Sequence, residues 1–294
     1  MQPEPGINRE LSLGEVVSKT FDVYRRDFAK YFVLFAVVEV ITGILTSLAQ
    51  HAIVLPILPS NPTPQQFYNY FPGFLGALAL LIVSVLVVTV VFFPIAQGGA
   101  IKMASDQIEK GQADIGTSVR FAASRLLWIW ALSIVVGIIV VLGFIALIVP
   151  GIILAIMFAL AFPVLLIEKK GVLDSMGRSR ALVGHRWLKT FAVFLVFAII
   201  FAIASVIVST ISGIFGIASP VVSGLLSAFY QPLFPILLTV YYYSNRARIT
   251  LPPPGPMPMA PTTSSQYEMK FCPSCGTQLS SPAAFCPKCG TRLN

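Results

Sequence analysis

Long apolar segments recur along most of the chain, and each has the length of a membrane-crossing helix. A crossing helix needs about 20 predominantly apolar residues. Six segments meet this description: 28–50, 73–97, 126–149, 151–167, 188–212 and 219–243. Hydrophobic residues make up 56% of the chain and charged residues only 11%, whereas a soluble domain carries about 25% charged residues. We therefore expect an all-α integral membrane protein with six transmembrane helices.

The 20 Lys and Arg residues lie only in alternate connecting segments. They occur up to Lys30, after the second and the fourth apolar segments, and in the C-terminal tail. The connections without any are 51–72, 149–151 and 213–218. Because Lys and Arg concentrate on the cytoplasmic side, we expect a multi-pass protein of the cell membrane with cytoplasmic N- and C-termini. This orientation accounts for the net charge of +8, so no nucleic-acid partner is expected.

The apolar segments fall into three pairs that share a pattern. The second member of each pair contains a Phe-Pro step, at Phe93-Pro94, Phe162-Pro163 and Phe234-Pro235. A basic, amphipathic stretch precedes each pair, at 13–28, 114–126 and 172–187. Such helices lie along the membrane interface against anionic lipid headgroups. The sequence therefore predicts three repeats of an interfacial helix followed by a helical hairpin, with a kink at each proline.

Local signals refine this scheme. Ser12 and Glu15 have the spacing of a capping box, which predicts a helix start. Pro150-Gly151 predicts the turn between the third and fourth crossings, because this pair breaks helices. The run Tyr241–Tyr243 ends the last apolar segment. We expect these rings at the headgroup level, because a tyrosine ring is apolar and its tip is polar.

The segment 150–187 has a recognisable pattern of its own. It contains Pro150-Gly151, Pro163, Glu168, Gly171, Asp174-Ser175, Arg178-Ser179 and Arg186-Trp187. The pattern resembles the membrane domain of glycerophosphoryl diester phosphodiesterases and its stand-alone relatives, over residues 10–248. The resemblance implies a six-helix membrane module. It does not imply phosphodiesterase activity, because catalysis in those enzymes belongs to a separate soluble barrel, and the longest soluble stretch here is the tail after Tyr243.

Four cysteines near the C-terminus form two copies of Cys-Pro-x-Cys-Gly, and they are Cys272, Cys275, Cys286 and Cys289. Four thiolates at this spacing predict one structural Zn²⁺ in a closed tetrahedral shell. The segment resembles the short zinc ribbons found at protein ends. Two disulfides or a redox dithiol are the alternatives. A cytoplasmic location would keep the thiols reduced and so favours zinc.

Composition divides the chain into four parts. They are a cytoplasmic N-terminal amphipathic segment (1–27), a membrane domain (28–248), a Pro-rich linker (249–270) and a zinc ribbon (271–294). A proline-rich linker holds a small domain at a distance from its anchor. We therefore expect the ribbon to bind a cytosolic protein partner.

A few charged residues are further candidates for function. Glu39 is the acid deep within a predicted crossing, where an ionisable residue is functional or is hydrogen-bonded for packing. Glu168 follows the fourth crossing and is expected to pair with a nearby cation rather than act as a catalytic acid. The basic residues Arg178, Arg180 and Arg186 are candidates for contacts with lipid phosphates, although orientation alone also explains them.

The sequence contains no phosphate loop, nucleophile elbow or dinucleotide fingerprint. We therefore expect a membrane scaffold or adaptor without enzymatic activity, in contact with the bilayer through anionic headgroups. A transporter or lipid-handling protein that uses Glu39 is the alternative. A membrane enzyme that uses Glu168 is a third hypothesis.

Overall fold

The computed structural model describes residues 6–52, 61–184, 186–250, 270–272, 274–279, 285–286 and 288–292. The chain divides into two compact units, Met1–Thr250 and Leu251–Asn294. The predicted linker 249–270 lies almost entirely outside the described residues.

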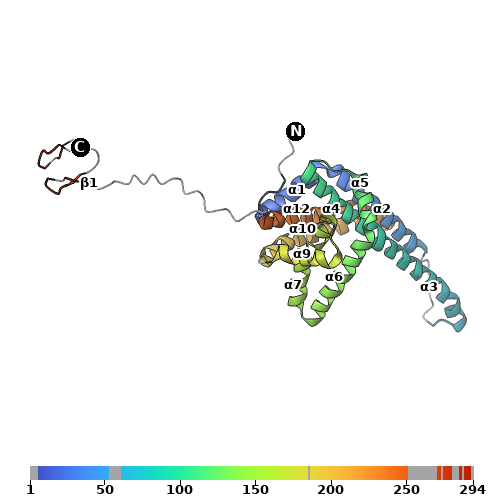
Figure 1. Cartoon of the computed structure of the whole chain (residues 1–294). Coiled ribbons are helices and arrows are strands. Elements are labelled where there is room, and N and C mark those ends of the chain that lie inside the picture. The colour runs from blue at the N-terminus through green and yellow to red at the C-terminus, as the bar shows by residue number, and fades with distance from the viewer. Residues whose placement is uncertain are drawn as a thin grey trace. The chain divides into compact units, whose positions relative to one another are not determined.

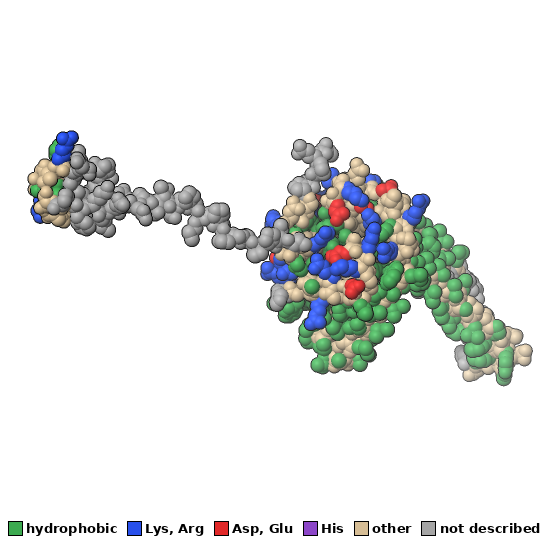
Figure 2. All heavy atoms as spheres, in the orientation of Figure 1, with side chains coloured by type: hydrophobic (Ala, Val, Ile, Leu, Met, Phe, Trp, Pro, Cys, Tyr) green, Lys and Arg blue, Asp and Glu red, His purple; other side chains and the backbone are tan. Residues whose placement is uncertain are grey.

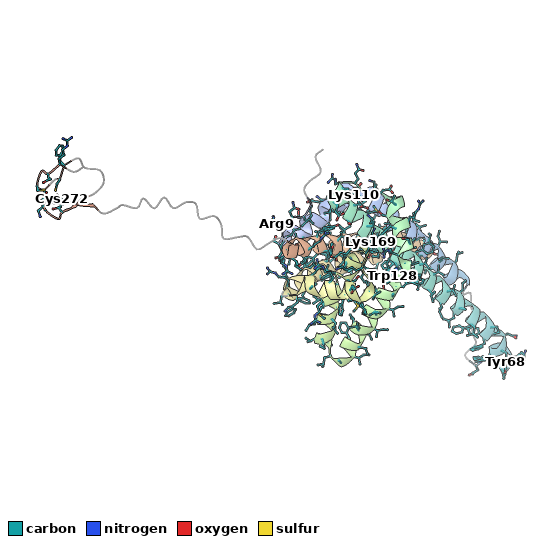
Figure 3. All side chains as sticks on the ribbon, viewed as in Figure 1. Arg9, Tyr68, Lys110, Trp128, Lys169 and Cys272 are labelled. Carbon is teal, nitrogen blue, oxygen red and sulfur yellow. The ribbon has the colours of Figure 1, made fainter. Side chains whose placement is uncertain are left out.

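The described part of the first unit consists of helices and their connections (Figure 1). The helices are α1 (Leu13–Arg26), α2 (Phe28–Ala52), α3 (Pro64–Val87), α4 (Phe93–Lys110), α5 (Ile115–Ser124), α6 (Leu126–Ala146), α7 (Ile148–Phe158), α8 (Ala161–Ile167), α9 (Val172–Val183), α10 (Trp187–Gly213), α11 (Ser219–Ser227) and α12 (Leu233–Thr250). A π-helical turn, Val88–Phe92, joins α3 to α4, and a 3-10 turn, Gly216–Ala218, precedes α11. Two hairpins, α2–α3 and α6–α7, project from the body of the unit, and Tyr68 lies near the far end of α3 (Figure 3).

Five helical segments among the described residues are long and apolar enough to cross a membrane. They are Phe28–Leu48, Pro64–Val83, Leu126–Ala146, Ile148–Ile167 and Trp187–Gly213. The sixth predicted crossing, 219–243, is not one continuous helix, because α11 ends at Ser227 and α12 begins at Leu233. The sequence predicted six crossings, whereas the described residues contain five apolar helices of this length.

The turn between α6 and α7 lies earlier than the sequence predicted. Leu147 has extended backbone angles, φ −168° and ψ 155°, and Pro150 lies in the first turn of α7. Proline is tolerated there because the amides of a first helical turn have no partner within the helix. Gly151 instead permits close packing, since a Cβ on it would stand 2.5 Å from the Phe144 ring. The prediction of a turn at Pro150-Gly151 was therefore wrong by a few residues.

The three Phe-Pro steps coincide with three interruptions of helix, as the predicted kinks required. Pro94 follows the π-helical turn, Pro163 follows the gap between α7 and α8, and Pro235 follows the gap between α11 and α12. Proline causes such breaks because it lacks an amide hydrogen and its ring collides with the carbonyl four residues earlier. The three predicted crossings that contain these steps are therefore not single uninterrupted α-helices.

Each interruption has a backbone carbonyl that accepts a hydrogen bond from a side chain of a different helix. The pairs are Trp130 Nε1 with Val90 O at 2.5 Å, Ser179 Oγ with Met157 O at 2.8 Å, and Tyr24 OH with Phe229 O at 2.6 Å. An unpaired carbonyl in an apolar environment costs several kcal/mol. The side chains of Trp130, Ser179 and Tyr24 therefore stabilise the helix interruptions, because each donates to a carbonyl at one of them from a neighbouring helix.

The three amphipathic stretches form α1, α5 and α9, as predicted. The Ser12–Glu15 capping box is present, with the Ser12 amide 2.8 Å from Glu15 Oε2. Asp114 caps α5 by accepting the Thr117 amide at 2.7 Å. In both helices the start is therefore set by a local side-chain contact.

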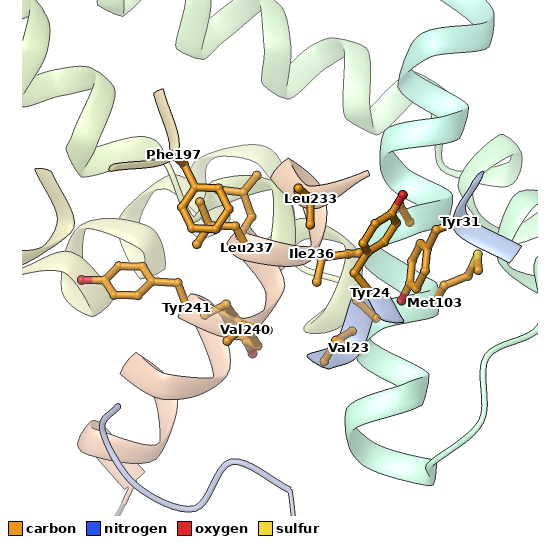
Figure 4. Packing of buried hydrophobic residues seen from close by; sticks show 14 of the residues in the cluster. Val23, Tyr24, Tyr31, Met103, Phe197, Leu233, Ile236, Leu237, Val240 and Tyr241 are labelled. Atoms are coloured by element: carbon orange, nitrogen blue, oxygen red, sulfur yellow. The ribbon is translucent and has the colours of Figure 1, made fainter. Parts of the chain in front are cut away.

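Helix α12 lies inside the bundle, so its tyrosines are not at an exposed interface. Tyr241, Tyr242 and Tyr243 are only 1%, 0% and 7% exposed. Consecutive helical residues point about 100° apart, so all three are buried because helices surround α12. Figure 4 shows Tyr241 near the core residues Leu237 and Val240 of α12. These rings therefore pack against other helices and not against lipid, and their depth at the headgroup level stays a prediction.

In the second unit the described residues form two small hairpins. Strand β1 (Lys270–Phe271) pairs antiparallel with β2 (Gln278–Leu279). A single bridge joins Phe285 to Arg292. Each hairpin carries two of the cysteines.

Candidate metal centre and polar clusters

The two cysteine hairpins have the same hydrogen-bond pattern. In the first, the Cys272 amide donates to Thr277 O at 3.0 Å and the Gly276 amide donates to Cys272 O at 2.8 Å. Gly276 has φ +69°, a left-handed conformation that glycine adopts without strain. The second hairpin repeats this arrangement with Cys286, Thr291 and Gly290. The backbone thus turns beneath each pair of sulfurs.

The four cysteine sulfurs converge on one point. All lie within 4.8 Å of one another, and the Sγ atoms of Cys272 and Cys289, like those of Cys275 and Cys286, are 3.6 Å apart. A zinc ion about 2.3 Å from each sulfur gives tetrahedral edges of about 3.8 Å. The four cysteines are free thiols, and 3.6 Å is far from the length of about 2.05 Å of a disulfide bond. The site therefore fits a tetrahedral metal ion such as zinc.

Two threonines that the sequence analysis missed support the cysteines. Thr277 Oγ1 lies 3.2 Å from Cys275 Sγ, and Thr291 Oγ1 lies 3.2 Å from Cys289 Sγ. A hydroxyl that donates to a thiolate orients the ligand and stabilises its charge. The signal was present in the sequence, because Thr follows Cys-Gly in both copies of the motif.

Glu168 lies in a saturated polar cluster at the end of α8. Its Oε1 accepts from Tyr242 OH at 2.9 Å and from Arg178 Nε at 3.3 Å, and its Oε2 lies 2.9 Å from Lys170 Nζ. Partial burial acts to raise the pKa of this carboxyl, but the three donors outweigh burial and hold the pKa below its ordinary value. Arg178 belongs to α9, so the cluster fastens α9 to α8 and α12.

Arg180 and Arg186, the other two arginines predicted to contact lipid, do not contact Glu168 in the described part of the chain. Arg180 is exposed on α9. Arg186, just before α10, pairs with Glu10 at 3.2 Å. The three arginines therefore do not share one partner.

Glu39 lies on α2 beside the interruption between α11 and α12. Its Oε1 accepts a hydrogen bond from Gln231 Nε2 at 2.6 Å. Helix α11 comes very close here, since a Cβ on Gly224 would stand 2.9 Å from Glu39 O. The structure thus gives Glu39 a neutral amide partner that is remote in sequence.

The tyrosine run of α12 connects three parts of the bundle. Tyr242 reaches Glu168, Tyr243 donates to Glu109 at 2.6 Å, and the Tyr241 hydroxyl lies 2.8 Å from Thr190 Oγ1. Glu109 belongs to α4, Glu168 directly follows α8, and Thr190 belongs to α10. Helix α12 therefore connects α4, the end of α8 and α10.

The fold and the cysteine site together define the class: a helical protein with membrane-length apolar helices and a C-terminal four-cysteine metal module. Among known families, the zinc-ribbon domain matches residues 271–293. No curated protein matches the chain, and no solved structure matches it. The resemblance of the helical unit to the glycerophosphoryl diester phosphodiesterase membrane domain has no supporting family match.

Proposed function

We propose that this protein is a membrane scaffold or adaptor without enzymatic activity, whose zinc ribbon binds a cytosolic protein. The ribbon holds one structural Zn²⁺, and the bilayer anchors the helical unit. The observation that carries the proposal is the closed set of four sulfurs in a unit separate from the helices. A metal with four protein ligands has no open position for a substrate. The ribbon therefore offers a folded surface and not a reactive metal.

The proposed topology has six crossings in three repeats of the glycerophosphoryl diester phosphodiesterase membrane-domain type, with both termini cytoplasmic in the cell membrane. Helices α11 and α12 together form the last crossing. The interruption of helix near each Phe-Pro step supports the repeat, because unrelated crossings would have no reason to break at matching positions. The restriction of all Lys and Arg to alternate connections supports the orientation. Anionic lipid headgroups face the basic side.

Cross-linking in native membranes tests the adaptor role. The wild-type chain is compared with a chain lacking 251–294 and with a Cys272→Ser, Cys286→Ser double variant that cannot complete the metal shell. Lys102→Gln, in the helical unit, is the matched control. We expect one set of cross-linked proteins to disappear in the first two variants and to persist in the control. Identical cross-linked proteins in all four samples would contradict the adaptor role.

A transporter or lipid-handling role is a second candidate, and the hydrogen bond of Glu39 to Gln231 favours it. An ionisable residue beside a broken helix is a common feature of transport sites. Proton flux into dye-loaded proteoliposomes tests this candidate, with Glu39→Gln against Glu109→Gln as control. Flux that survives only in the control supports a role for Glu39. Flux that is equal in both variants argues against it.

A membrane enzyme that uses Glu168 gains no support from the geometry. The Glu168 carboxylate already accepts a hydrogen bond from Tyr242 and forms ion pairs with Arg178 and Lys170. A general acid or base needs a free path to the proton that it transfers. We therefore keep Glu168 as a structural residue in the proposal.

A further inference from the structure

Two cations at the start of α10 form ion pairs with one carboxylate before α1, and a third cation acts on that carboxylate electrostatically. Glu10 Oε2 lies 3.2 Å from Arg186 Nη2, and Glu10 Oε1 lies 2.5 Å from Lys189 Nζ. Arg248, near the end of α12, is the third cation. Partial burial acts to raise the pKa of Glu10, but Lys189, Arg186 and Arg248 outweigh it and hold the pKa below its ordinary value. We call these four residues the Glu10 cluster.

The Glu10 cluster carries more positive charge than its carboxylate neutralises. Three cations face one anion, so two positive charges remain. Arg248 Nη2 donates to Leu182 O at 2.9 Å, but the buried Arg248 Nε has no acceptor in the described part of the chain. A buried donor without an acceptor is costly. A ligand with more charge and more acceptor oxygens than a carboxylate would complete these interactions, and a phosphate group has both properties.

The position of the cluster indicates the source of that phosphate. Arg186 directly precedes Trp187 and Leu188, which are 51% and 63% exposed. These two begin α10, one of the five helices long and apolar enough to cross a membrane. Tryptophan at the end of such a helix marks the headgroup level. Figure 2 shows the charged side chains gathered at one end of the helical unit, next to apolar surface. A phosphate at this level belongs to a lipid headgroup.

The carboxylate that now occupies the cluster belongs to a short connection and not to a helix. Glu10 lies in the non-helical segment 6–12. Its neighbour Leu11 is held separately, since the Leu11 amide donates to Ser244 Oγ at 2.8 Å and Leu11 O accepts from Lys189 Nζ at 2.7 Å. The Glu10 side chain can therefore leave its cations while the backbone of the segment remains attached.

We propose that Arg186, Lys189 and Arg248 form a headgroup site for an anionic phospholipid, and that Glu10 is an intramolecular competitor for this site. The phosphate oxygens replace the Glu10 oxygens, and the released side chain turns to solvent. This inference rests on the proposed function in one respect, namely that the basic side of the protein faces anionic lipid. It adds the residues that bind the lipid and the residue that opposes it.

Lipid titration of the full-length, zinc-loaded protein, followed by native mass spectrometry, tests the proposal. The probe is phosphatidylglycerol, and phosphatidylcholine is the zwitterionic comparison. One surface charge changes lipid affinity by about 1 kcal/mol, or about fivefold. We expect Glu10→Gln to strengthen binding of phosphatidylglycerol by about fivefold and Arg186→Gln to weaken it by about fivefold. Lys102→Gln removes a cation from a different ion pair, with Asp106, and should leave affinity unchanged.

Each alternative result has a distinct meaning. Unchanged or weaker binding in Glu10→Gln would overturn the competitor role, and equal losses in Arg186→Gln and Lys102→Gln would overturn the specific site. In both cases, if the wild-type protein still preferred phosphatidylglycerol, the proposal that its basic side faces anionic lipid would remain supported. If the wild-type protein showed no such preference, the proposed contact between its basic side and anionic lipid would be wrong. Millimolar inorganic phosphate should not compete, and full competition would assign the site to free phosphate.

Arg186→Gln is easier to interpret than a substitution of Lys189 would be. Lys189 also holds the Leu11 carbonyl, so its removal disturbs the fold as well as the charge. Arg186 is 47% exposed in its side chain and has a smaller structural role. Thermal unfolding of each variant in detergent accompanies the titration. A lipid effect in a variant with unchanged unfolding temperature supports the headgroup site.

Discussion

The Tyr242 hydroxyl donates a 2.9 Å hydrogen bond to Oε1 of Glu168, 74 residues away in the chain. Tyr242 is fully buried in α12, and Glu168 caps the C-terminal end of α8. The contact therefore joins two helices at a carboxylate that also holds Arg178 of α9. Its removal should affect the whole end of the bundle and not one helix alone.

Tyr242→Phe tests the strength of this contact. The variant keeps the ring and removes only the hydroxyl, so the half-buried carboxylate loses a donor. Hydrogen bonds to charged groups contribute about 1.5–3 kcal/mol, and we expect the free energy of unfolding to fall by an amount of this order. Chemical unfolding in detergent measures it. Tyr68→Phe, at an exposed site on α3, is the matched control, and equal stability of the two variants would contradict the prediction.

The pH dependence of stability should follow from the same carboxylate. The pKa of Glu168 is lowered in the folded protein, so its charged form stabilises the fold above the unfolded pKa of about 4.3. This contribution is lost as the pH falls through the folded pKa. Unfolding measured between neutral and acidic pH should therefore show a gap between wild type and Glu168→Gln that narrows below about pH 4.3. A gap that stays constant would show that the charge of Glu168 does not stabilise the fold.

Helix starts were predictable from the sequence because the contacts that set them are local. Ser12 and Glu15 are three residues apart, and so are Asp114 and the Thr117 amide that it caps. The cysteine site was predictable for the same reason, since each pair of ligands lies in one hairpin. Thr277 lies one residue beyond the Cys-Pro-x-Cys-Gly motif, so the spacing of the ligands alone does not include it.

Other features depend on packing that no local pattern records. Pro150 is compatible with a turn and with the first turn of a helix, so the sequence alone could not place the turn between α6 and α7. The burial of Tyr241 depends on which helices surround α12. The partner of Glu39 is Gln231, 192 residues away, and only the fold brings them together.

The threonine hydroxyls of the ribbon should contribute to metal affinity. Substitutions that remove an outer hydrogen bond to a ligand cost about 10–100-fold in metal affinity. We expect a Thr277→Val, Thr291→Val double variant to bind zinc more weakly by a factor in this range. Competition with a chromophoric chelator measures the affinity. A Thr277→Ser, Thr291→Ser variant keeps both hydroxyls and should bind zinc almost as tightly as wild type. Equal weakening in both variants would assign the effect to packing.

Gly151→Ala should destabilise the hairpin that α6 and α7 form. A Cβ there would stand 2.5 Å from the Phe144 ring, and overpacking of this kind costs about 1–3 kcal/mol. Gly137, on α6, has open space around it. Gly137→Ala should therefore be neutral or slightly stabilising, because alanine favours helix by about 1 kcal/mol over glycine. Thermal unfolding measures the stability of the Gly151→Ala and Gly137→Ala variants. Equal unfolding temperatures would contradict the close approach of α6 and α7.

The hydrogen bond from Trp130 to the Val90 carbonyl should stabilise the π-helical turn between α3 and α4. Val90 precedes Pro94 by four residues, so its carbonyl is the one that proline deprives of a helical donor. Trp130→Phe keeps an aromatic ring in place and removes the N–H, and should lower stability by about 1–3 kcal/mol.

Hydrogen exchange should locate that effect. Because the carbonyl would lose its outside donor, amides near residues 88–92 should exchange faster in Trp130→Phe than in wild type. Trp128→Phe is the control, since Trp128 lies on the same helix and is 47% exposed. If amide exchange in this turn were unchanged in Trp130→Phe, or equally fast in both variants, the carbonyl would not depend on the indole. The break at Pro94 would then be stabilised by packing alone.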